Sequence, residues 1–248
     1  MQSSDPTKTI AERLAALRGT LRWNPRREEI LHDLQDLIAT VDESRLDALR
    51  RDYAERLQKA GPASRYKYLD VVFHTLQKLL LARALGLHEG SPRRVLDIGT
   101  GGGHLPFVCR FYGHEVVGID VKDAFYDGLA ACLGVQRTVV RVEAQTPLPD
   151  LGGRFDVITA LGVRFNNKGN RDGRRLYWSP AEWQSFLDDL VANQLRRPGM
   201  LYFTLNKESR GRLLGFHHHA YNREVLGLAA RRGAVVSLWH GTIKLSFA

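Results

Sequence analysis

Seven short runs of apolar and β-branched residues follow one another in the later part of the chain, and stretches with helical periodicity separate most of them. These runs cover residues 93–98, 114–119, 138–142, 155–161, 200–205, 234–239 and 242–247. Strands that alternate with helices and are apolar on both faces are typical of a parallel sheet covered on both sides. Only His240 and Gly241 separate the last two runs, too few for a helical crossover, so these runs should form an antiparallel hairpin. The sequence therefore predicts an α/β domain with a seven-stranded, mostly parallel sheet and an antiparallel last strand.

The first ninety residues predict helices only. Apolar side chains recur at helical spacing in segments near 6–21, 26–39, 42–60 and 68–85. A cap-like Ser4-Asp5 followed by Pro6 predicts the start of the first segment. We therefore expect two domains: residues 1–90 form an N-terminal helical cap or lid region, and residues 91–248 form the α/β domain.

Charge and hydropathy narrow the range of partners. The 248 residues carry 36 Lys and Arg against 27 Asp and Glu, and residues 91–248 hold +7 of the net charge of +9. This balance favours an anionic substrate or RNA, but no RGG segment or aromatic-basic RNP pattern accompanies it, so we do not expect nucleic acid as the partner. No stretch reaches the ~18–20 apolar residues of a membrane span, and the first residues lack the apolar core of a secretory signal. These features predict a cytoplasmic protein without a membrane partner.

A glycine-rich loop follows the first apolar run, in the segment VLDIGTGGGH at residues 95–104. Such a loop lets the backbone approach a ligand closely, beside the N-terminus of the next helix. A dinucleotide fingerprint requires G-x-G-x-x-G, yet His104 stands where the third glycine should be when the count starts at Gly99. The NAD interpretation therefore fails. Asp97, two residues before Gly99, instead favours a ligand with a cationic centre and an amino-acid tail.

An acidic residue closes the second apolar run. Asp120 follows Gly99 at about the 20-residue spacing at which a carboxylate accepts hydrogen bonds from ribose hydroxyls. Taken alone, Asp120 would serve equally well as a cap for the helix that starts near Lys122. Together with the glycine loop, it predicts a ribose-binding carboxylate.

The third apolar run ends near Glu143. Its side chain is suited to accept from an adenine amino group, and the backbone N–H of Ala144 is suited to reach a ring nitrogen. The alternative for Glu143 is an exposed glutamate at the end of a strand.

The motifs VLDIGTGGG, VVGID, VEA and FDVITA, in this order, resemble those of the class I S-adenosylmethionine-dependent methyltransferases. The match covers roughly residues 93–248, and the segment from Leu161 to Glu208 is similar to bacterial small-molecule and sugar-modifying members. The resemblance implies a Rossmann-like sheet with S-adenosylmethionine across its strand ends. The cofactor-binding residues that it implies are Asp97, Gly99, Thr100, Gly101 and Gly103 for the methionine part, Asp120 for the ribose and Glu143 with Ala144 for the adenine, together with Val121 and Leu161.

Methyl transfer is an in-line displacement that depends mainly on orientation, and a general base is needed only if the acceptor loses a proton during attack. The region after the fourth run, residues 162–177, should overhang the reacting centre, and it contains no N/D-P-P-Y/F motif. Arg164 and Asn166 are candidates to position a hydroxyl or carboxylate acceptor, with a solvated loop as the alternative. His104 is a further catalytic candidate, and its alternative is a polar residue that starts a helix.

A metal site is not expected. His217, His218 and His219 are consecutive, so they cannot all face one ion on a regular element, and no HxxE motif stands nearby. The two cysteines, Cys109 and Cys132, have no CxxC spacing, which supports neither a zinc site nor a disulfide framework.

These observations predict an S-adenosylmethionine-dependent methyltransferase that acts on a small anionic or polyhydroxylated acceptor, at oxygen. The alternatives are an RNA methyltransferase, suggested by charge alone, and a non-catalytic S-adenosylmethionine-binding module. The aromatic and basic segment at residues 64–68 is a candidate lid or pocket wall. The N-terminal helices are equally suited to form a homodimer interface.

Overall fold

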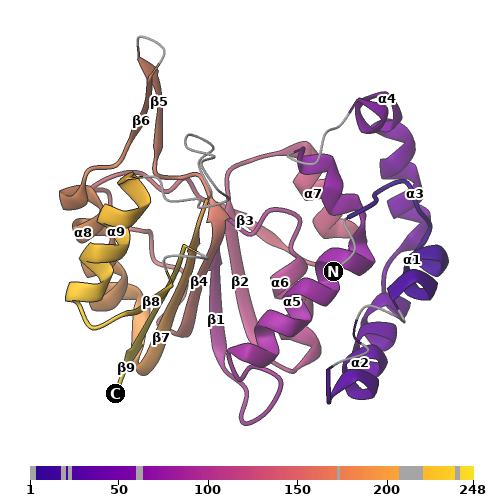
Figure 1. Ribbon diagram of the computed structural model, residues 1–248, viewed down its shortest axis with the longest axis horizontal. Coiled ribbons are helices and arrows are strands. Elements are labelled where there is room, and N and C mark those ends of the chain that lie inside the picture. Colours follow the sequence, from indigo (N-terminus) through magenta and orange to yellow (C-terminus); the bar gives the residue numbers. More distant parts are fainter. Residues whose placement is uncertain are drawn as a thin grey trace. The chain divides into compact units, whose positions relative to one another are not determined.

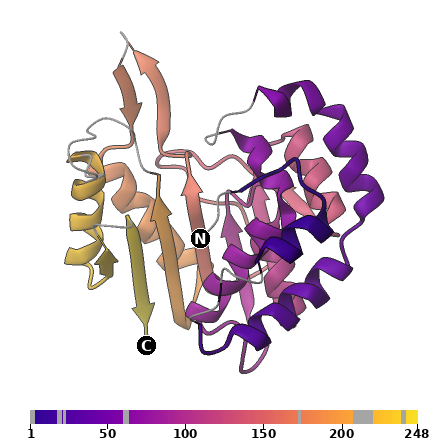
Figure 2. The same ribbon diagram turned by 45° about the vertical axis from the view of Figure 1, so that its right-hand side comes forward.

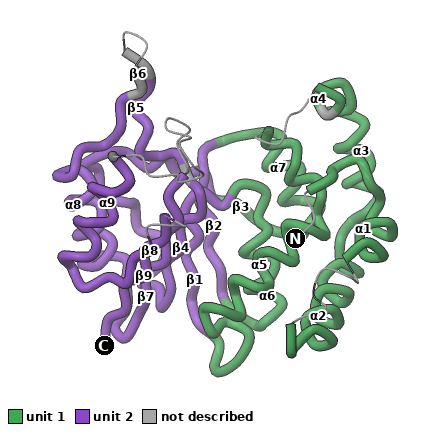
Figure 3. Tube along the Cα trace, viewed as in Figure 1, with its two compact units in different colours: residues 1–92, 101–114, 122–137 green, residues 93–100, 115–121, 138–248 purple. Residues whose placement is uncertain are grey.

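The computed structural model describes residues 4–17, 21, 24–59, 64–171, 174–206, 220–237 and 241–248. The chain divides into two compact units (Figure 3). Unit 1 comprises Met1–Pro92, Gly101–His114 and Lys122–Arg137, and unit 2 comprises Arg93–Thr100, Glu115–Val121 and Thr138–Ala248. The first boundary lies two residues from the predicted domain boundary, but two later segments group with the N-terminal helices.

A seven-stranded sheet forms the centre of unit 2 (Figure 1). Its strands are β1 (Arg94–Ile98), β2 (Glu115–Asp120), β3 (Arg137–Val139), β4 (Phe155–Val163), β7 (Leu195–Leu205), β8 (Val235–Ser237) and β9 (Thr242–Phe247). They lie in the order β3-β2-β1-β4-β7-β9-β8. β1 is parallel to β2 and β4, and β4 is parallel to β7, whereas β9 is antiparallel to both β7 and β8. The predicted sheet with its antiparallel last strand is confirmed, and its strand order is that of an open, Rossmann-like α/β sheet.

The edge strand β3 is shorter than predicted. The third apolar run was predicted to extend to residue 142, but β3 ends at Val139. β3 is an edge strand with β2 as its neighbour, and two of its three residues are exposed. The strand therefore ends before Glu143, because this edge has little buried surface to stabilise further pairing.

Helices of unit 2 cover a sheet face. They are α8 (Pro180–Asp189), the π-helix η2 (Leu190–Gln194) and α9 (Ala220–Arg231). Ser179 caps α8 in a reciprocal box with Glu182. α8 and α9 lie side by side next to the strands (Figure 1 and Figure 2). Trp183 and Phe186 of α8 pack in one core with Phe203 of β7.

A second, two-stranded element was not predicted. Strands β5 (Asn167–Arg171) and β6 (Arg174–Tyr177) pair antiparallel where the sequence suggested only a loop (Figure 1). Their sequence lacks alternating apolar residues, so the hydrophobic pattern does not reveal them.

Unit 1 consists of helices. They are α1 (Ile10–Leu17), α2 (Arg27–Ala39), α3 (Glu43–Asp52), α4 (Ala54–Gln58), the 3₁₀ helix η1 (Arg65–Leu69), α5 (Val71–Ala84), α6 (His104–Phe111) and α7 (Ala124–Cys132). The predicted N-terminal helical region is thus confirmed. The predicted start of α1 near Pro6 is wrong, because Thr9 and Glu12 cap the helix reciprocally and Ile10 is its first residue.

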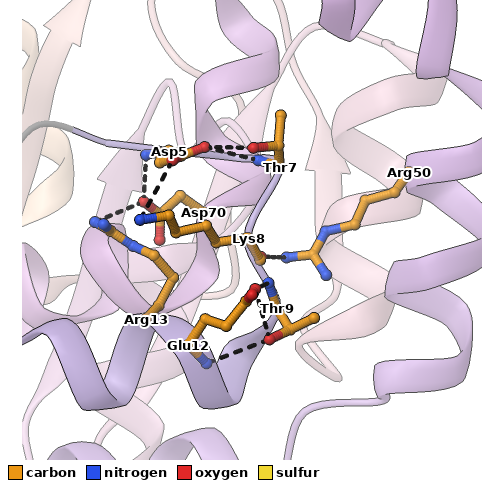
Figure 4. A network of polar contacts seen from close by, with 8 residues as sticks. All are labelled: Asp5, Thr7, Lys8, Thr9, Glu12, Arg13, Arg50 and Asp70. Carbon is orange, nitrogen blue, oxygen red and sulfur yellow. Dashed lines mark hydrogen bonds and ion pairs between the residues drawn. The ribbon is translucent and has the colours of Figure 1, made fainter.

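A buried ion pair joins α1 to the start of α5 (Figure 4). Arg13 lies 2.8 Å from the Asp70 carboxylate, and both side chains are almost completely buried. Asp70 also accepts from the backbone N–H groups of Asp5 (2.7 Å) and Phe73 (3.1 Å), the second of which caps α5. Burial raises the pKa of the Asp70 carboxyl, and these three donors counteract that effect. One carboxylate therefore holds the N-terminal segment, α1 and α5 together.

No helix in the described residues is long and apolar enough to span a membrane.

Candidate functional site

The carboxyl end of β1 places Asp97 inside the sheet of unit 2. Asp97 is paired with Gly118 of β2 and Thr159 of β4, and only 3% of it is exposed. The Thr159 hydroxyl donates to Asp97 Oδ1 over 2.7 Å. This hydrogen bond fixes the carboxylate beneath the strand ends.

The turn after β1 is tied to β2. The N–H groups of Gly99 and Thr100 both donate to the carbonyl of Ile119, over 2.8 and 3.1 Å. Gly99 has φ +73°, a conformation that favours glycine. A Cβ atom on Gly118 would lie 3.0 Å from Thr100 Oγ1, so a larger residue at this point of β2 would push Thr100 out of its position. Thr100 Oγ1 itself is buried without a hydrogen-bond partner among the described residues.

The rest of the glycine loop belongs to unit 1, where packing explains one of its glycines. A Cβ atom on Gly102 would meet the side chain of Leu129 at only 2.4 Å. Gly103 has φ +82° and is the N-cap of α6. Gly101, with φ +55°, lies beside the ring of Tyr126. Gly102 is therefore required for helix packing within unit 1, irrespective of any ligand.

Asp120 is the last residue of β2, which lies next to β1. Its Oδ1 accepts from the N–H of Val121 over 2.7 Å, and its backbone carbonyl accepts from Val140 over 2.9 Å. Asp120 is half-buried and Val121 is exposed. The carboxylate is thus oriented locally at the carboxyl end of its strand.

The other predicted cofactor residues lie in the same unit. Glu143 is exposed and Ala144 is half-buried in the segment beyond β3, where Gln145 has φ +60°. Leu161 is half-buried near the end of β4. Their roles toward a cofactor stay predictions.

Of the two acceptor-side candidates, Asn166 lies in a pocket and Arg164 does not line it. Asn166 Nδ2 donates to the Tyr221 hydroxyl over 3.0 Å. The side chain of Arg164 is exposed, and its carbonyl accepts from Asn167. The pocket is lined by Ala160, Phe165, Asn166, Trp183, Phe203, Thr204, Leu205, Asn206 and Asn222.

Sequence analysis missed the polar residues on the far side of this pocket. Thr204 is the penultimate residue of β7 and Asn206 follows its last residue, so the same rule that selected Asp120, a polar side chain at the carboxyl end of a parallel strand, would have found them. Asn222 lies on α9, and no local sequence signal indicates that it faces the pocket.

His104 starts α6 in unit 1 and is buried. Its Nε2 donates to the carbonyl of Tyr68 over 3.2 Å, so Nδ1 is the unprotonated nitrogen, and it has no partner among the described residues. The ring of His74 lies 5.6 Å away and also has an unpartnered buried nitrogen. Burial lowers the pKa of His104 to about 3 and, together with His104, that of His74 to about 2. Both rings are therefore neutral at physiological pH.

The residues 217–219 lie outside the described part of the chain. Within the described ranges, no group of three His, Cys, Asp or Glu residues is arranged to hold a metal ion. Cys109 and Cys132 are buried thiols that form no disulfide within the described residues.

Comparison with known proteins gives similarity at the level of structure. No protein-family model matches the sequence, and no curated protein matches it significantly. A ribosomal protein L11 methylase from Lactobacillus delbrueckii subsp. bulgaricus is 18% identical over 70% of this chain and 78% of its own, with a TM-score of 0.42. A TehB-like SAM-dependent methyltransferase from Corynebacterium glutamicum is 16% identical over 67% of this chain and 86% of its own, with a TM-score of 0.41.

SAM-bound CalS10, an amino pentose methyltransferase from Micromonospora echinaspora, is 20% identical with a TM-score of 0.37. That alignment covers 53% of this chain, which spans 50% of the length of CalS10.

Proposed function

We propose that this chain is an S-adenosylmethionine-dependent methyltransferase that methylates a small-molecule acceptor, at oxygen. One observation carries the proposal. Three neighbouring parallel strands, β2, β1 and β4, bring Asp120, the Gly99–Thr100 turn and Leu161 to the same edge of one sheet. Ligands of open α/β sheets bind outside the carboxyl ends of the strands.

The residues at this edge fit the cofactor. The Asp120 carboxylate, held by the N–H of Val121, is suited to accept hydrogen bonds from two ribose hydroxyls. Thr100 Oγ1 is buried and has no hydrogen-bond partner in the described part of the chain, so a ligand's amino-acid group would satisfy it. The Asp97 carboxylate, buried below the turn, favours a ligand with positive charge.

When bound, S-adenosylmethionine would supply a methyl group activated by a sulfonium centre. The acceptor oxygen would attack the methyl carbon in line, S-adenosylhomocysteine would leave as a neutral thioether, and the hydroxyl proton would pass to water. The chain's own contribution is to hold both partners in that geometry, which is worth about 7–11 kcal/mol in well-oriented reactions. Asp120 and Thr100 fix the donor on the β2–β1 side. The acceptor would lie beside the donor, where β4 and β7 end near Asn166.

Calorimetric titration with S-adenosylhomocysteine tests the cofactor. The protein should bind this ligand in the micromolar range and should not prefer NAD. Asp120→Ala should weaken binding about 100-fold, because it removes hydrogen bonds to a charged group that contribute about 1.5–3 kcal/mol each. Asp120→Asn, which keeps the Oδ1 acceptor, should lose less.

Asp150→Ala is the matched control, since Asp150 is an exposed aspartate of unit 2 that caps a turn at Gly152. It should leave the affinity unchanged. A wild-type protein that does not bind S-adenosylhomocysteine, or that prefers NAD, would refute the proposal. With an acceptor in hand, transfer of a ¹³C-labelled methyl group identifies the methylated atom from its chemical shift.

A further inference from the structure

A small polar pocket lies where β4 and β7 end. Ala160 of β4 lines it and pairs with Ile98, the residue before Gly99, so the pocket is one strand away from the glycine turn. Trp183 and Phe203 form its apolar walls, and each is only 1% exposed. The pocket has room for about one water molecule. Its ligand must therefore be a molecule of that size.

Two hydrogen bonds determine which polar atoms of β7 and α9 remain for this ligand. Asn222 Nδ2 donates to the carbonyl of Asn206 over 2.9 Å, which leaves Asn222 Oδ1 as an acceptor. The N–H of Gly162 donates to Thr204 Oγ1 over 2.9 Å, so the hydroxyl hydrogen of Thr204 is available as a donor. The pocket thus offers one acceptor and one donor from this side.

Asn166 supplies a second acceptor and is held in place by a polar clamp. Its Nδ2 donates to the Tyr221 hydroxyl over 3.0 Å, which leaves Asn166 Oδ1 as the acceptor. The same hydroxyl accepts from Trp183 Nε1 over 2.5 Å. The ring of Tyr221 stacks on that of Tyr177, with centroids 4.8 Å apart. The side chain of Asn166 is therefore oriented before any ligand arrives.

These three polar groups match the hydrogen-bonding capacity of one water molecule. A water donates two hydrogen bonds and accepts two, and a buried water usually makes about three. Its hydrogens would go to the amide oxygens of Asn166 and Asn222, and the Thr204 hydroxyl would donate to its oxygen. One lone pair of the water is then left for a donor outside the chain.

We propose that the pocket binds one water molecule and that this water orients the attacking oxygen by accepting a hydrogen bond from the acceptor's hydroxyl group. The inference rests on the proposed function, which places the acceptor where β4 and β7 end. A hydroxyl can donate to the water while its own lone pair points at the methyl carbon. When the C–O bond forms and the C–S bond breaks, the hydroxyl proton passes to this water and on to solvent.

The water also selects among acceptors. An ionised carboxylate has no hydrogen to donate to the remaining lone pair. Of the two acceptor types predicted from the sequence, the water therefore favours the hydroxylated one. Asn166, Asn222 and Thr204 act as positioning residues, because they reach the acceptor only through the water.

A high-resolution crystal structure of the full chain with S-adenosylhomocysteine tests the inference. One water should lie about 2.7–3.2 Å from Asn166 Oδ1, Asn222 Oδ1 and Thr204 Oγ1. Crystals soaked in methanol should show the methanol oxygen within hydrogen-bond distance of this water, and crystals soaked in sodium formate should show no formate there. Absence of the water, a protein donor at its fourth position, or methanol that does not enter or is outmatched by formate would overturn the inference.

Variants test whether the three groups hold the water. Asn222→Leu and the nearly isosteric Thr204→Val each put an apolar group where the water has a polar partner, so each should abolish the water peak while the affinity for S-adenosylhomocysteine stays the same. Asn193→Leu is the control, because Asn193 is exposed and bonds to Asp189 in the same unit, and it should change neither. A water that persists in both pocket variants overturns the inference. Failure of the wild type to bind S-adenosylhomocysteine overturns the proposed function instead.

Discussion

Asp70→Ala is expected to lower the free energy of unfolding by about 3–5 kcal/mol, because it removes the carboxylate that balances the charge of the buried Arg13 guanidinium. The same change removes the acceptor for Phe73 N–H, a capping bond whose loss costs about 1 kcal/mol. For a chain of this length, this corresponds to a fall in Tm of roughly 10 °C. Urea unfolding followed by circular dichroism gives the free energy directly.

Two further variants separate the effect of breaking the ion pair on stability from the effect of removing one negative charge. Glu12→Gln keeps the reciprocal cap with Thr9 on the exposed start of α1, so it should change stability by less than about 0.5 kcal/mol. The double variant Arg13→Met with Asp70→Asn leaves no unpaired buried charge and should recover most of the loss. A cost below 1 kcal/mol for Asp70→Ala would show that the pair in Figure 4 does not hold unit 1 together.

Acidification from pH 7.5 to 5 is expected to cost the fold up to about 4 kcal/mol through two histidines alone. The folded-state pKa values of His74 and His104 lie near 2 and 3, below the unfolded value of 6.5. The unfolded chain therefore binds more protons than the folded one between these limits, so stability is present above pH 6.5 and is lost as the pH falls. Each pH unit below 6.5 costs about 1.4 kcal/mol per histidine.

The comparison of variants isolates this contribution from that of other groups. His74→Gln and His104→Gln should each remove about 2 kcal/mol of the change between pH 7.5 and 5, whatever they do to stability at pH 7.5. Gln35→Asn is the control, since it is an exposed change on α2 that alters no titratable group, and it should leave the pH dependence unaltered. Equal pH dependence in the wild type and both buried-site variants would contradict the neutral buried pair.

Periodicity was sufficient to predict the sheet and the helices, but not the β5–β6 hairpin. The run at 155–161 is apolar because β4 is central and buried, and β4 begins at the predicted residue. The hairpin carries mostly polar residues, so no core face marks it. Its indication was instead the turn-forming pair Asp172-Gly173 in the sequence between the two strands.

The cofactor side and the acceptor side of the candidate site differ in how far they can be predicted from the sequence. Asp97, Gly99 and Asp120 follow from local motifs, because consecutive strands β1 and β2 are neighbours in the sheet. The pocket combines Asn166 with Asn222, which are far apart in the chain. Their proximity depends on how α9 packs against the sheet, and sequence spacing carries no record of it.

Gly102 shows that folding and ligand binding place separate demands on one loop. Leu129 leaves no room for a side chain at Gly102, so selection for a stable helix pair would keep that glycine even in a descendant that had lost its cofactor. Asp120 differs from Gly102 because no packing contact requires an aspartate there; its Oδ1 accepts a hydrogen bond from the N–H of Val121 at the end of its own strand. In a comparison of relatives, chains that keep the glycine but have lost the aspartate are expected to keep the fold without the catalytic activity.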